Sequence, residues 1–270
     1  MINAKVRMNW LTSILLALLP TLAFGQVVSV EFKDKGFLFS DAPTLTFLWP
    51  AKQAKATLVF IPGGEGKIGL TPERANLGGF YGATLRPLSD DKLTSGSFNV
   101  VVFDSPVALP NGTDYPYSRQ SNEHLLRIQS VVNFYKEKFG LPVWLMGHSN
   151  GAVSITEFYK LMQKNKNEKL VDGTVYSSAR NGAAFTDETQ LPILFLAHEK
   201  DGCEKSLPSR SLQEYQRQQK SNKAKLEYVV IKGGEPQGQV CTTGHHMFYG
   251  AAKEAYGAID QFVFGSALKQ

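Results

Sequence analysis

The stretch "LMGHSNGAVS", residues 145–154, is the most informative part of the sequence. It continues the apolar run "PVWLM" and carries the pattern Gly-x-Ser-x-Gly at residues 147–151, directly before a helical pattern at 151–165. Between a strand and a helix this pattern predicts a tight, strained turn from which Ser149 projects above a sheet. A bulky side chain at either glycine would clash with the neighbouring strand or helix, which explains why both positions are glycine.

Working outward, short runs rich in β-branched and aromatic residues recur along the chain and predict strands. Eight such runs lie at 27–32, 44–49, 56–61, 98–104, 142–147, 173–178, 192–198 and 225–231. The first two have no helix between them, which predicts an antiparallel start, while most later runs are continuously apolar, as in a buried parallel sheet. Helical patterns alternate with the later runs at 121–140, 151–165, 209–220 and 252–268. The alternation predicts an α/β fold with a mostly parallel, doubly wound, eight-stranded sheet and antiparallel N-terminal strands.

With this order of elements, the sequence resembles the α/β-hydrolase family over residues 27–268. The resemblance rests on the antiparallel lead-in, the Gly-rich loop after the third strand, the Gly-x-Ser-x-Gly turn after the fifth, and later loops that carry an acid and a histidine. That family uses a serine, an acid and a histidine in this chain order, so the resemblance implies that Ser149 is the nucleophile. It implies neither a metal nor an organic cofactor.

The catalytic acid is expected in a loop that follows a late strand. The segment "LFLAHEKDGC" places Asp201 a few residues beyond the seventh predicted strand. A carboxylate there can accept a hydrogen bond from a histidine ring and stabilise the imidazolium. Glu199 is the nearby alternative. Asp172 begins a strand instead of following one, so we expect it at the opposite edge of the sheet.

The catalytic base is expected in the loop between the last strand and the final helix. The segment "GGEPQGQVCTTGHHMFYGAA" offers His245 and His246 there. The resemblance favours His246, because the catalytic histidine of hydrolases is often followed closely by an aromatic or small residue that leads into the last helix. His245 remains the alternative. His124 lies early in a predicted helix, which indicates a surface or capping position.

The segment "IPGGEGKIGL", residues 61–70, permits two interpretations. Its glycines at 64, 66 and 69 have the spacing of a dinucleotide-binding loop, but no helix pattern opens directly after it, and the next candidate acid, Asp104, lies about 35 residues on, where about 20 is usual. As an oxyanion loop it needs only a close backbone approach, which glycine permits. We therefore predict that Gly64 or Glu65 donates one backbone N–H to an oxyanion and Asn150 donates the other. The Glu65 side chain is expected to point away from the oxyanion or toward a polar substrate group.

The first 25 residues have the pattern of a cleaved secretory signal. Lys5 and Arg7 form a basic start, "WLTSILLALLPTLAF" supplies the apolar stretch, and small residues at 23 and 25 precede Gln26. The apolar run is short for a membrane span. We predict a signal peptide at 1–25, export to the periplasm or the medium, and no stable membrane anchor after cleavage.

The remaining chain, residues 26–270, is long enough for a single catalytic domain. Loss of Lys5 and Arg7 lowers its formal net charge from +5 to +3. Its basic residues are scattered and form no stripe with interleaved aromatic side chains, which argues against nucleic acid as a partner.

Two cysteines, Cys203 and Cys241, lie in the exported part of the chain and are expected to pair in an oxidising compartment. The bond would stabilise the fold by about 4 kcal/mol on the chain-entropy model. Because Cys203 follows Asp201 by two residues and Cys241 precedes His246 by five, the disulfide would tie the acid loop to the histidine loop. Two cysteines alone cannot form a structural zinc site.

Together these features predict an exported serine hydrolase that cleaves a carboxylic ester of a small molecule through an acyl-enzyme. An amide or peptide bond is the alternative substrate, and a non-catalytic binding protein on the same fold is the alternative function. Residues 67–87 and 105–120 are expected to wall the site, with Phe80, Tyr81, Tyr115, Tyr117 and Arg119 as candidate lining residues. Arg119 indicates either an acidic group on the substrate or a surface or salt-bridged arginine.

Overall fold

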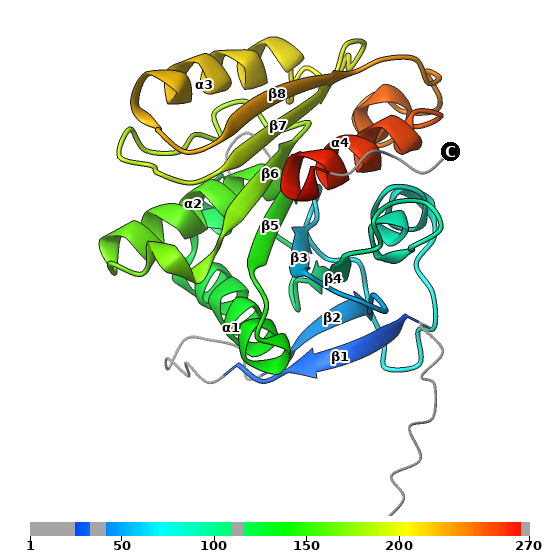
Figure 1. Ribbon diagram of the computed structural model, residues 1–270, viewed down its shortest axis with the longest axis vertical. Coiled ribbons are helices and arrows are strands. Elements are labelled where there is room, and N and C mark those ends of the chain that lie inside the picture. Colours follow the sequence, from blue (N-terminus) through cyan, green and yellow to red (C-terminus); the bar gives the residue numbers. More distant parts are fainter. Residues whose placement is uncertain (1–24, 33–41, 110–115, 266–270) are drawn as a thin grey trace, which may run out of the picture.

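The computed structural model describes residues 25–32, 42–109 and 116–265. Its centre is one continuous eight-stranded sheet in the order β1-β2-β4-β3-β5-β6-β7-β8 (Figure 1). β1 pairs with β2 and β2 with β4 in antiparallel fashion, and the other neighbours are parallel. The strands are β1 Gln26–Val30, β2 Thr44–Trp49, β3 Ala56–Ile61, β4 Phe98–Asp104, β5 Val143–His148, β6 Gly173–Ser177, β7 Ile193–His198 and β8 Leu226–Ile231.

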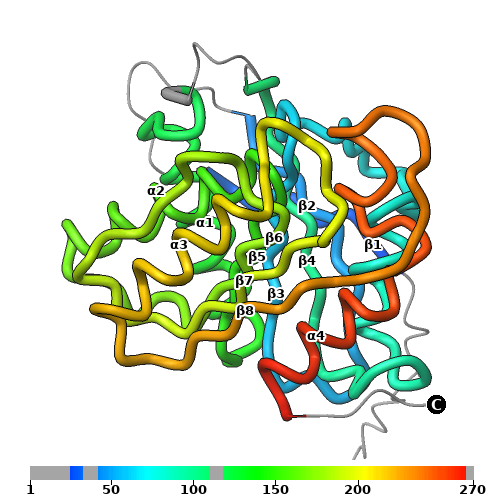
Figure 2. Tube along the Cα trace, turned by 90° about the horizontal axis from the view of Figure 1, so that it is seen from above, coloured from blue at the N-terminus to red at the C-terminus, as the bar shows by residue number. Residues whose placement is uncertain are grey.

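Helices cover both faces of the sheet, with α1, α2 and α3 on one face and α4 on the other (Figures 1 and 2). The four helices are α1 Asn122–Phe139, α2 Gly151–Lys164, α3 Pro208–Ser221 and α4 Ala252–Phe264. Five short helical turns accompany them: η1 Tyr81–Leu85, η2 Arg86–Ser89, η3 Pro116–Gln120, η4 Glu168–Leu170 and η5 Gly244–Met247. The sequence-predicted fold, a doubly wound and mostly parallel sheet with an antiparallel start, is confirmed.

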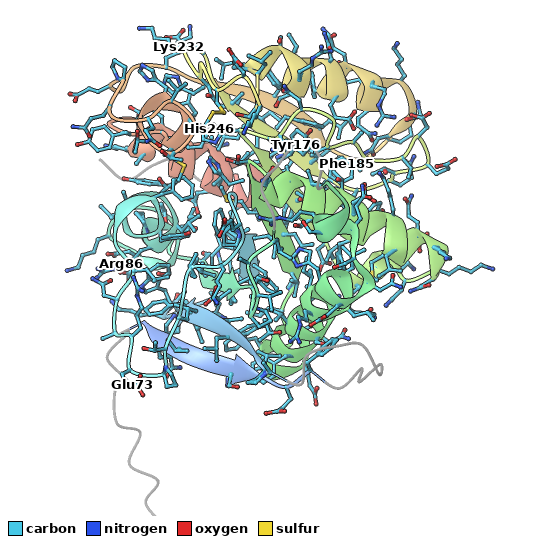
Figure 3. All side chains as sticks on the ribbon, turned by 180° about the vertical axis from the view of Figure 1, so that it is seen from behind. Glu73, Arg86, Tyr176, Phe185, Lys232 and His246 are labelled. Carbon is cyan, nitrogen blue, oxygen red and sulfur yellow. A yellow bond between two sulfur atoms is a disulfide. The ribbon has the colours of Figure 1, made fainter. Side chains whose placement is uncertain are left out.

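Two hydrophobic cores hold these layers together, because successive side chains of a strand point to opposite faces. In β3, Val59 and Ile61 join the core under α1 and α2, while Leu58 and Phe60 join the core under α4 and η2. On the first face, the rings of Tyr176 and Phe185 lie side by side with centroids 6.0 Å apart (Figure 3). Both cores support the carboxyl ends of the parallel strands, where ligands bind in sheets of this kind.

The predicted strands and helices match the observed ones within one or two residues, except that α4 ends at Phe264, before the helix terminator Gly265. The turns η1 and η2 lie in the weakly periodic segment 65–97 and were not predicted. Residues 1–24 of the predicted signal peptide, 1–25, lie outside the described residues. Across the described ranges, no helix is both long enough and apolar enough to traverse a bilayer.

Candidate active site

The turn between β5 and α2 has the strained geometry that the Gly-x-Ser-x-Gly pattern predicts. Ser149 has a φ of 56°, a left-handed conformation that non-glycine residues rarely adopt. Its N–H donates to the carbonyl of Ser177 at 3.0 Å, which holds the turn to β6. A Cβ atom at Gly147 would lie 2.4 Å from the carbonyl oxygen of Gly151, and one at Gly151 would lie 2.0 Å from that of Ile61. Both glycines are therefore required by close backbone contacts.

Asp201 and His246 form a buried pair. The Nδ1 atom of His246 lies 2.8 Å from the Oδ2 atom of Asp201, and each side chain is 1% exposed. The second carboxylate oxygen of Asp201 accepts the N–H of Cys203 at 3.0 Å, and the hydroxyl of Ser206 lies 3.1 Å from His246 Nδ1. These contacts fix the ring and place the Nδ1 proton on the side of the carboxylate.

The alternative acid and base are placed elsewhere. The ring of His245 stacks on His198, with centroids 4.5 Å apart, and Glu199 is exposed. Asp172 accepts the N–H of Val143 at 2.8 Å, at the beginning of β5 and thus at the opposite edge of the sheet from Ser149. The structure thus brings together the favoured pair, Asp201 and His246.

The other ring nitrogen of His246, Nε2, is buried and has no hydrogen-bond partner in the described part of the chain. The ring of His148, the residue before Ser149, lies beside it with centroids 5.0 Å apart. Burial, and secondly the neighbouring His246, lower the pKa of His148 well below its usual value. His148 is therefore neutral, and its ring nitrogens contact the Ser177 hydroxyl at 3.0 Å and the Met247 sulfur at 3.2 Å.

The loop after β3 passes directly over Ser149. A Cβ atom at Gly63 would lie 2.8 Å from the Cβ atom of Ser149 and 3.5 Å from its hydroxyl oxygen, so only glycine permits this approach. Gly64 follows with a φ of 53°, and the side chain of Glu65 is exposed. Gly63 is thus the loop residue in contact with the serine, and the predicted oxyanion donors Gly64 and Glu65 follow it directly in the chain.

Arg119 is not a surface residue, since it is only 2% exposed, and it forms no salt bridge with any residue that the structure describes. Its Nη1 donates to the carbonyl of Pro62 at 3.0 Å, and its Nη2 donates to those of Gly63 and Gly64 at 3.3 and 2.9 Å. Burial, and secondly the charge of Arg180, lower the pKa of Arg119 to about 10, so the guanidinium stays charged at neutral pH. The expectation of a surface arginine is wrong because this cation satisfies three loop carbonyls.

Behind Arg119 lies a second buried contact. The hydroxyl of Ser154 accepts from Arg119 Nη1 at 3.0 Å and lies 2.8 Å from His124 Nε2. His124 is 3% exposed, so the predicted surface or capping position is wrong. Burial, followed by the charges of Arg119 and Arg127, lowers the pKa of His124 to about 3.

The carboxylate of Asp104 binds the backbone of the loop after β3. It accepts N–H groups from Ile68 at 2.6 Å, Gly69 at 3.4 Å and Leu70 at 2.6 Å. Burial raises the pKa of Asp104, while these bonds oppose the shift. Because the carboxylate holds the loop and no helix opens after Gly69, the dinucleotide interpretation of residues 61–70 is wrong.

Asn150 connects the two sides of the site. Its side-chain amide donates to the carbonyl of Gly64 at 3.1 Å and accepts from Arg180 Nη1 at 2.9 Å. The backbone N–H of Arg180 in turn donates to the carbonyl of Ser149 at 3.1 Å. Sequence patterns carried no signal for the Arg180 contact, which depends on the loop after β6 meeting the start of α2.

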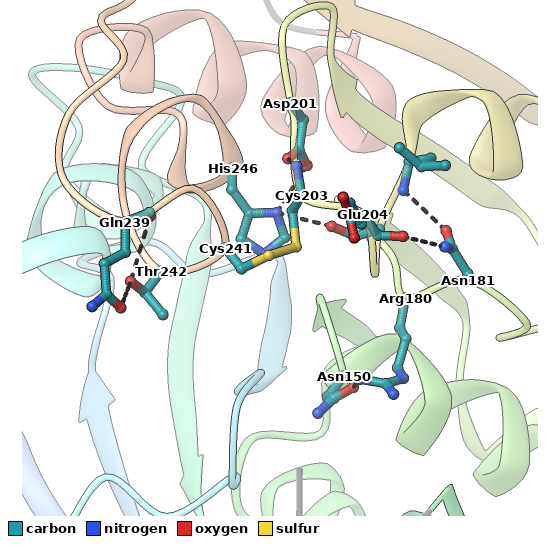
Figure 4. The surroundings of a disulfide bond; sticks show 12 residues. Asn150, Arg180, Asn181, Asp201, Cys203, Glu204, Gln239, Cys241, Thr242 and His246 are labelled. Atoms are coloured by element: carbon teal, nitrogen blue, oxygen red, sulfur yellow. Dashed lines mark hydrogen bonds and ion pairs between the residues drawn. A yellow bond between two sulfur atoms is a disulfide. The ribbon is translucent and has the colours of Figure 1, made fainter. Parts of the chain in front are cut away.

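The Cys203–Cys241 disulfide is present and lies beside the imidazole of His246 (Figure 4). It joins the loop after β7, where Asp201 lies, to the segment directly before η5. His246 lies within η5. Cys203 is buried and Cys241 is exposed. The predicted pairing is therefore confirmed, and its position allows it to hold the two loops together.

A cavity of about 410 Å³ adjoins the histidine loop. The ring of Phe80 forms part of its wall and lies against His148, with centroids 4.8 Å apart. Tyr81 packs on Phe60 next to Phe80. Tyr115 and the side chain of Tyr117 lie outside the described part of the structure. The cavity is lined by Gly79, Phe80, Ala83, Thr84, Gln237, Thr242, Thr243, Gly244, Met247, Phe248, Tyr249, Gly250 and Ala252.

A larger hollow of about 520 Å³ lies between β1 and α1 and shares no residue with this site. Across residues 25–32, 42–109 and 116–265, no three His, Cys, Asp or Glu side chains gather in a group that could hold a metal ion.

No family model and no curated protein matches this sequence. Its structure is similar to several solved ones. Dienelactone hydrolase from Anabaena variabilis has a TM-score of 0.59 at 11% identity, covering 91% of this chain and all of that one. A lid-free α/β serine hydrolase from Xanthomonas campestris has a TM-score of 0.57 at 13% identity, covering 91% and 95%. Brefeldin A esterase, a bacterial homologue of human hormone-sensitive lipase, has a TM-score of 0.58 at 12% identity, covering 97% and 79%.

These similarities and the strand order define the fold of this protein as the α/β-hydrolase fold. The sequence resemblance to that family is thus matched by the three-dimensional structure.

Proposed function

We propose that this protein is an exported serine hydrolase that cleaves a carboxylic ester of a small molecule. The observation that carries the proposal is the buried His246–Asp201 pair, whose unpartnered Nε2 atom lies at the same end of the sheet as the strained Ser149 turn. A buried nitrogen without a partner is costly to stability, and such costs concentrate at functional sites. An incoming serine hydroxyl would supply the missing contact.

In the proposed mechanism, Ser149 Oγ attacks the ester carbonyl while His246 Nε2 accepts the hydroxyl proton. Asp201 holds the imidazole in the required tautomer and stabilises the imidazolium. The N–H groups of Asn150 and of Gly64 or Glu65 bind the oxyanion, each contributing about 3 kcal/mol in the transition state. His246 then passes the proton to the leaving alcohol, and water repeats the sequence to release the acid from the acyl-enzyme.

The cavity beside His148 supports a substrate with a small non-polar group. Its wall includes the side chains of Phe80, Met247 and Phe248, and its volume of about 410 Å³ is at the lower end of the range for small-molecule sites.

Export is part of the same proposal. A signal peptide at 1–25 would send the chain to the periplasm or the medium, leaving one catalytic domain at 26–270. The disulfide supports this location, because such bonds persist in oxidising compartments.

Hydrolysis of p-nitrophenyl esters of increasing acyl length, alongside the matching p-nitroanilides, tests the proposal. We expect short esters to be turned over and Ser149→Ala to lose at least about 10⁴-fold in kcat. Comparable hydrolysis of esters and anilides would redirect the proposal to an amidase. A folded wild-type protein that turns over neither would favour a binding protein on the hydrolase fold.

A further inference from the structure

Three consecutive carbonyl groups converge on one buried cation. Pro62, Gly63 and Gly64 all accept hydrogen bonds from the guanidinium of Arg119, at 3.0, 3.3 and 2.9 Å. The contacts span 55 to 57 residues in sequence, so they fix the loop after β3 against η3. A further bond from Arg119 to the Ser154 hydroxyl ties the guanidinium to the first turn of α2. Gly64 is held twice, because its carbonyl also accepts the side-chain amide of Asn150 at 3.1 Å.

These carbonyls belong to the same peptide groups as the candidate oxyanion donors. The carbonyl of Gly63 shares a peptide plane with the N–H of Gly64, and the carbonyl of Gly64 shares one with the N–H of Glu65. The described chain contains no cis peptide bond, so in each plane the N–H points opposite to the C=O. Anchoring both carbonyls on Arg119 therefore turns both N–H groups away from it.

Ser149 lies against the same loop. The contact at Gly63 is so close that a Cβ atom there would meet the Ser149 side chain at 2.8 Å. Neither Gly64 nor Glu65 donates its N–H to another group within the described part of the chain. Both amides are thus unengaged in the two residues that follow this contact, with a positive charge at the opposite end of their peptide dipoles.

We propose that Arg119 is a positioning residue of the oxyanion hole, which fixes and polarises the peptide groups of Gly64 and Glu65 through their carbonyl ends. The proposal rests on the hydrolase function proposed above. Hydrogen bonds to a charged donor are about twice as strong as neutral ones, so the cation strengthens the dipoles as well as orienting them. Donors aligned before the reaction need no reorganisation when the oxyanion forms.

A direct contact between Arg119 and the substrate is inconsistent with its surroundings. The guanidinium is buried and packs under Gly66, where a Cβ atom would lie 3.1 Å from Nη2. A positioning role predicts that loss of the guanidinium lowers kcat and leaves KM nearly unchanged, whereas a substrate-anchoring arginine would raise KM.

The test compares Arg119→Lys and Arg119→Ala with wild type, in kcat and KM for a short p-nitrophenyl ester and in the rate of labelling by a fluorophosphonate. Arg127→Lys and Arg127→Ala are the matched controls. Arg127 is also a buried arginine that donates to a backbone carbonyl, that of Ala42 at 2.7 Å, and it pairs with Glu123 of its own helix at 2.8 Å. Melting temperatures show which variants fold.

We expect both Arg119 variants to lose about 100-fold or more in kcat and labelling rate, with KM within about threefold of wild type. Millimolar guanidinium chloride, far below denaturing concentrations, should restore part of the activity of Arg119→Ala, while sodium chloride of equal ionic strength should not. The Arg127 variants should lose stability but keep kcat. Ser154→Ala, a smaller change that removes one acceptor of the guanidinium, should fold and lower kcat about threefold.

An Arg119→Lys protein with unchanged kcat, or a change in KM alone, would overturn the positioning role. If the Arg119 variants fail to fold, an unchanged kcat in Ser154→Ala overturns it instead. Absence of labelling in folded wild type would refute the hydrolase function itself, and the role of Arg119 with it.

Discussion

The imidazole of His246 is held by the carboxylate of Asp201 at 2.8 Å, in a pair that is almost completely removed from solvent. Because the acid sets the tautomer of the ring, Asp201→Asn should lower kcat for ester hydrolysis by about 10³- to 10⁴-fold without unfolding the protein. Glu199→Gln is the matched control, since Glu199 is an exposed acid two residues away. Equal losses in the two variants would show that the carboxylate of Asp201 has no special part in catalysis.

The disulfide should contribute to stability and to activity together. Cys241→Ser removes the bond by changing an exposed residue, so its effect reports on the bond and not on lost packing. We expect the free energy of unfolding to fall by about 4 kcal/mol, as measured by urea denaturation. We also expect kcat to fall, because Cys203 donates its N–H to Asp201 and the bond links that loop to His246.

Reduction of the disulfide in the wild-type protein should lower the free energy of unfolding and kcat in the same way. If reduction leaves both the urea midpoint and kcat unchanged, the bond does not hold the acid and histidine loops in place.

Stability should fall on mild acidification because two histidines are buried in the neutral form. Burial lowers the pKa of His124 to about 3 and that of His148 well below its usual 6.5. Below pH 6.5 the unfolded chain binds protons that the folded protein cannot, so the free energy of unfolding decreases as the pH falls. For His124 this loss should be about 2 kcal/mol between pH 6.5 and pH 5, and His148 should add to it in the same direction.

Urea denaturation across this pH range, with His124→Gln beside wild type, measures the effect. The variant should show a weaker dependence of the unfolding free energy on pH, because one of the buried neutral histidines is no longer present to titrate. A slope identical to that of wild type would mean that His124 is not a source of the acid sensitivity.

Export should leave a chain that begins at Gln26. Expression of the full sequence in a bacterial host, followed by fractionation and N-terminal sequencing, checks the cleavage site. A Gly25→Leu variant should be processed poorly, because signal cleavage requires a small residue at that position. Recovery of an uncleaved chain from the cytoplasm would contradict export.

Much of the fold was predictable because it depends on local patterns. Continuous apolar runs such as 98–104 become strands buried on both faces, and the glycines around Ser149 leave room for only one backbone path. The order of serine, acid and histidine along the chain followed from the family resemblance, and the choice between His245 and His246 needed the three-dimensional contact to Asp201.

Arg119 and His124 show what local patterns miss. Arg119 lies in a polar segment and its partners are carbonyls 55 to 57 residues away, so no neighbouring residue signals its burial. His124 lies in the first turn of α1 and is buried because Ser154 of α2 offers it a hydrogen bond. The turns η1 and η2 were missed because glycine and proline interrupt the apolar residues of their 81–89 segment, which takes its shape from packing against α4.

The most direct test of the proposed hydrolase is labelling of the mature protein with a fluorophosphonate, followed by peptide mapping. The proteins compared are wild type, Ser149→Ala, His246→Ala and His245→Ala. We predict a single labelled site at Ser149, lost in the Ser149 and His246 variants and retained in His245→Ala. A folded wild-type protein that takes up no label, or a label that survives Ser149→Ala, would contradict Ser149 as the nucleophile.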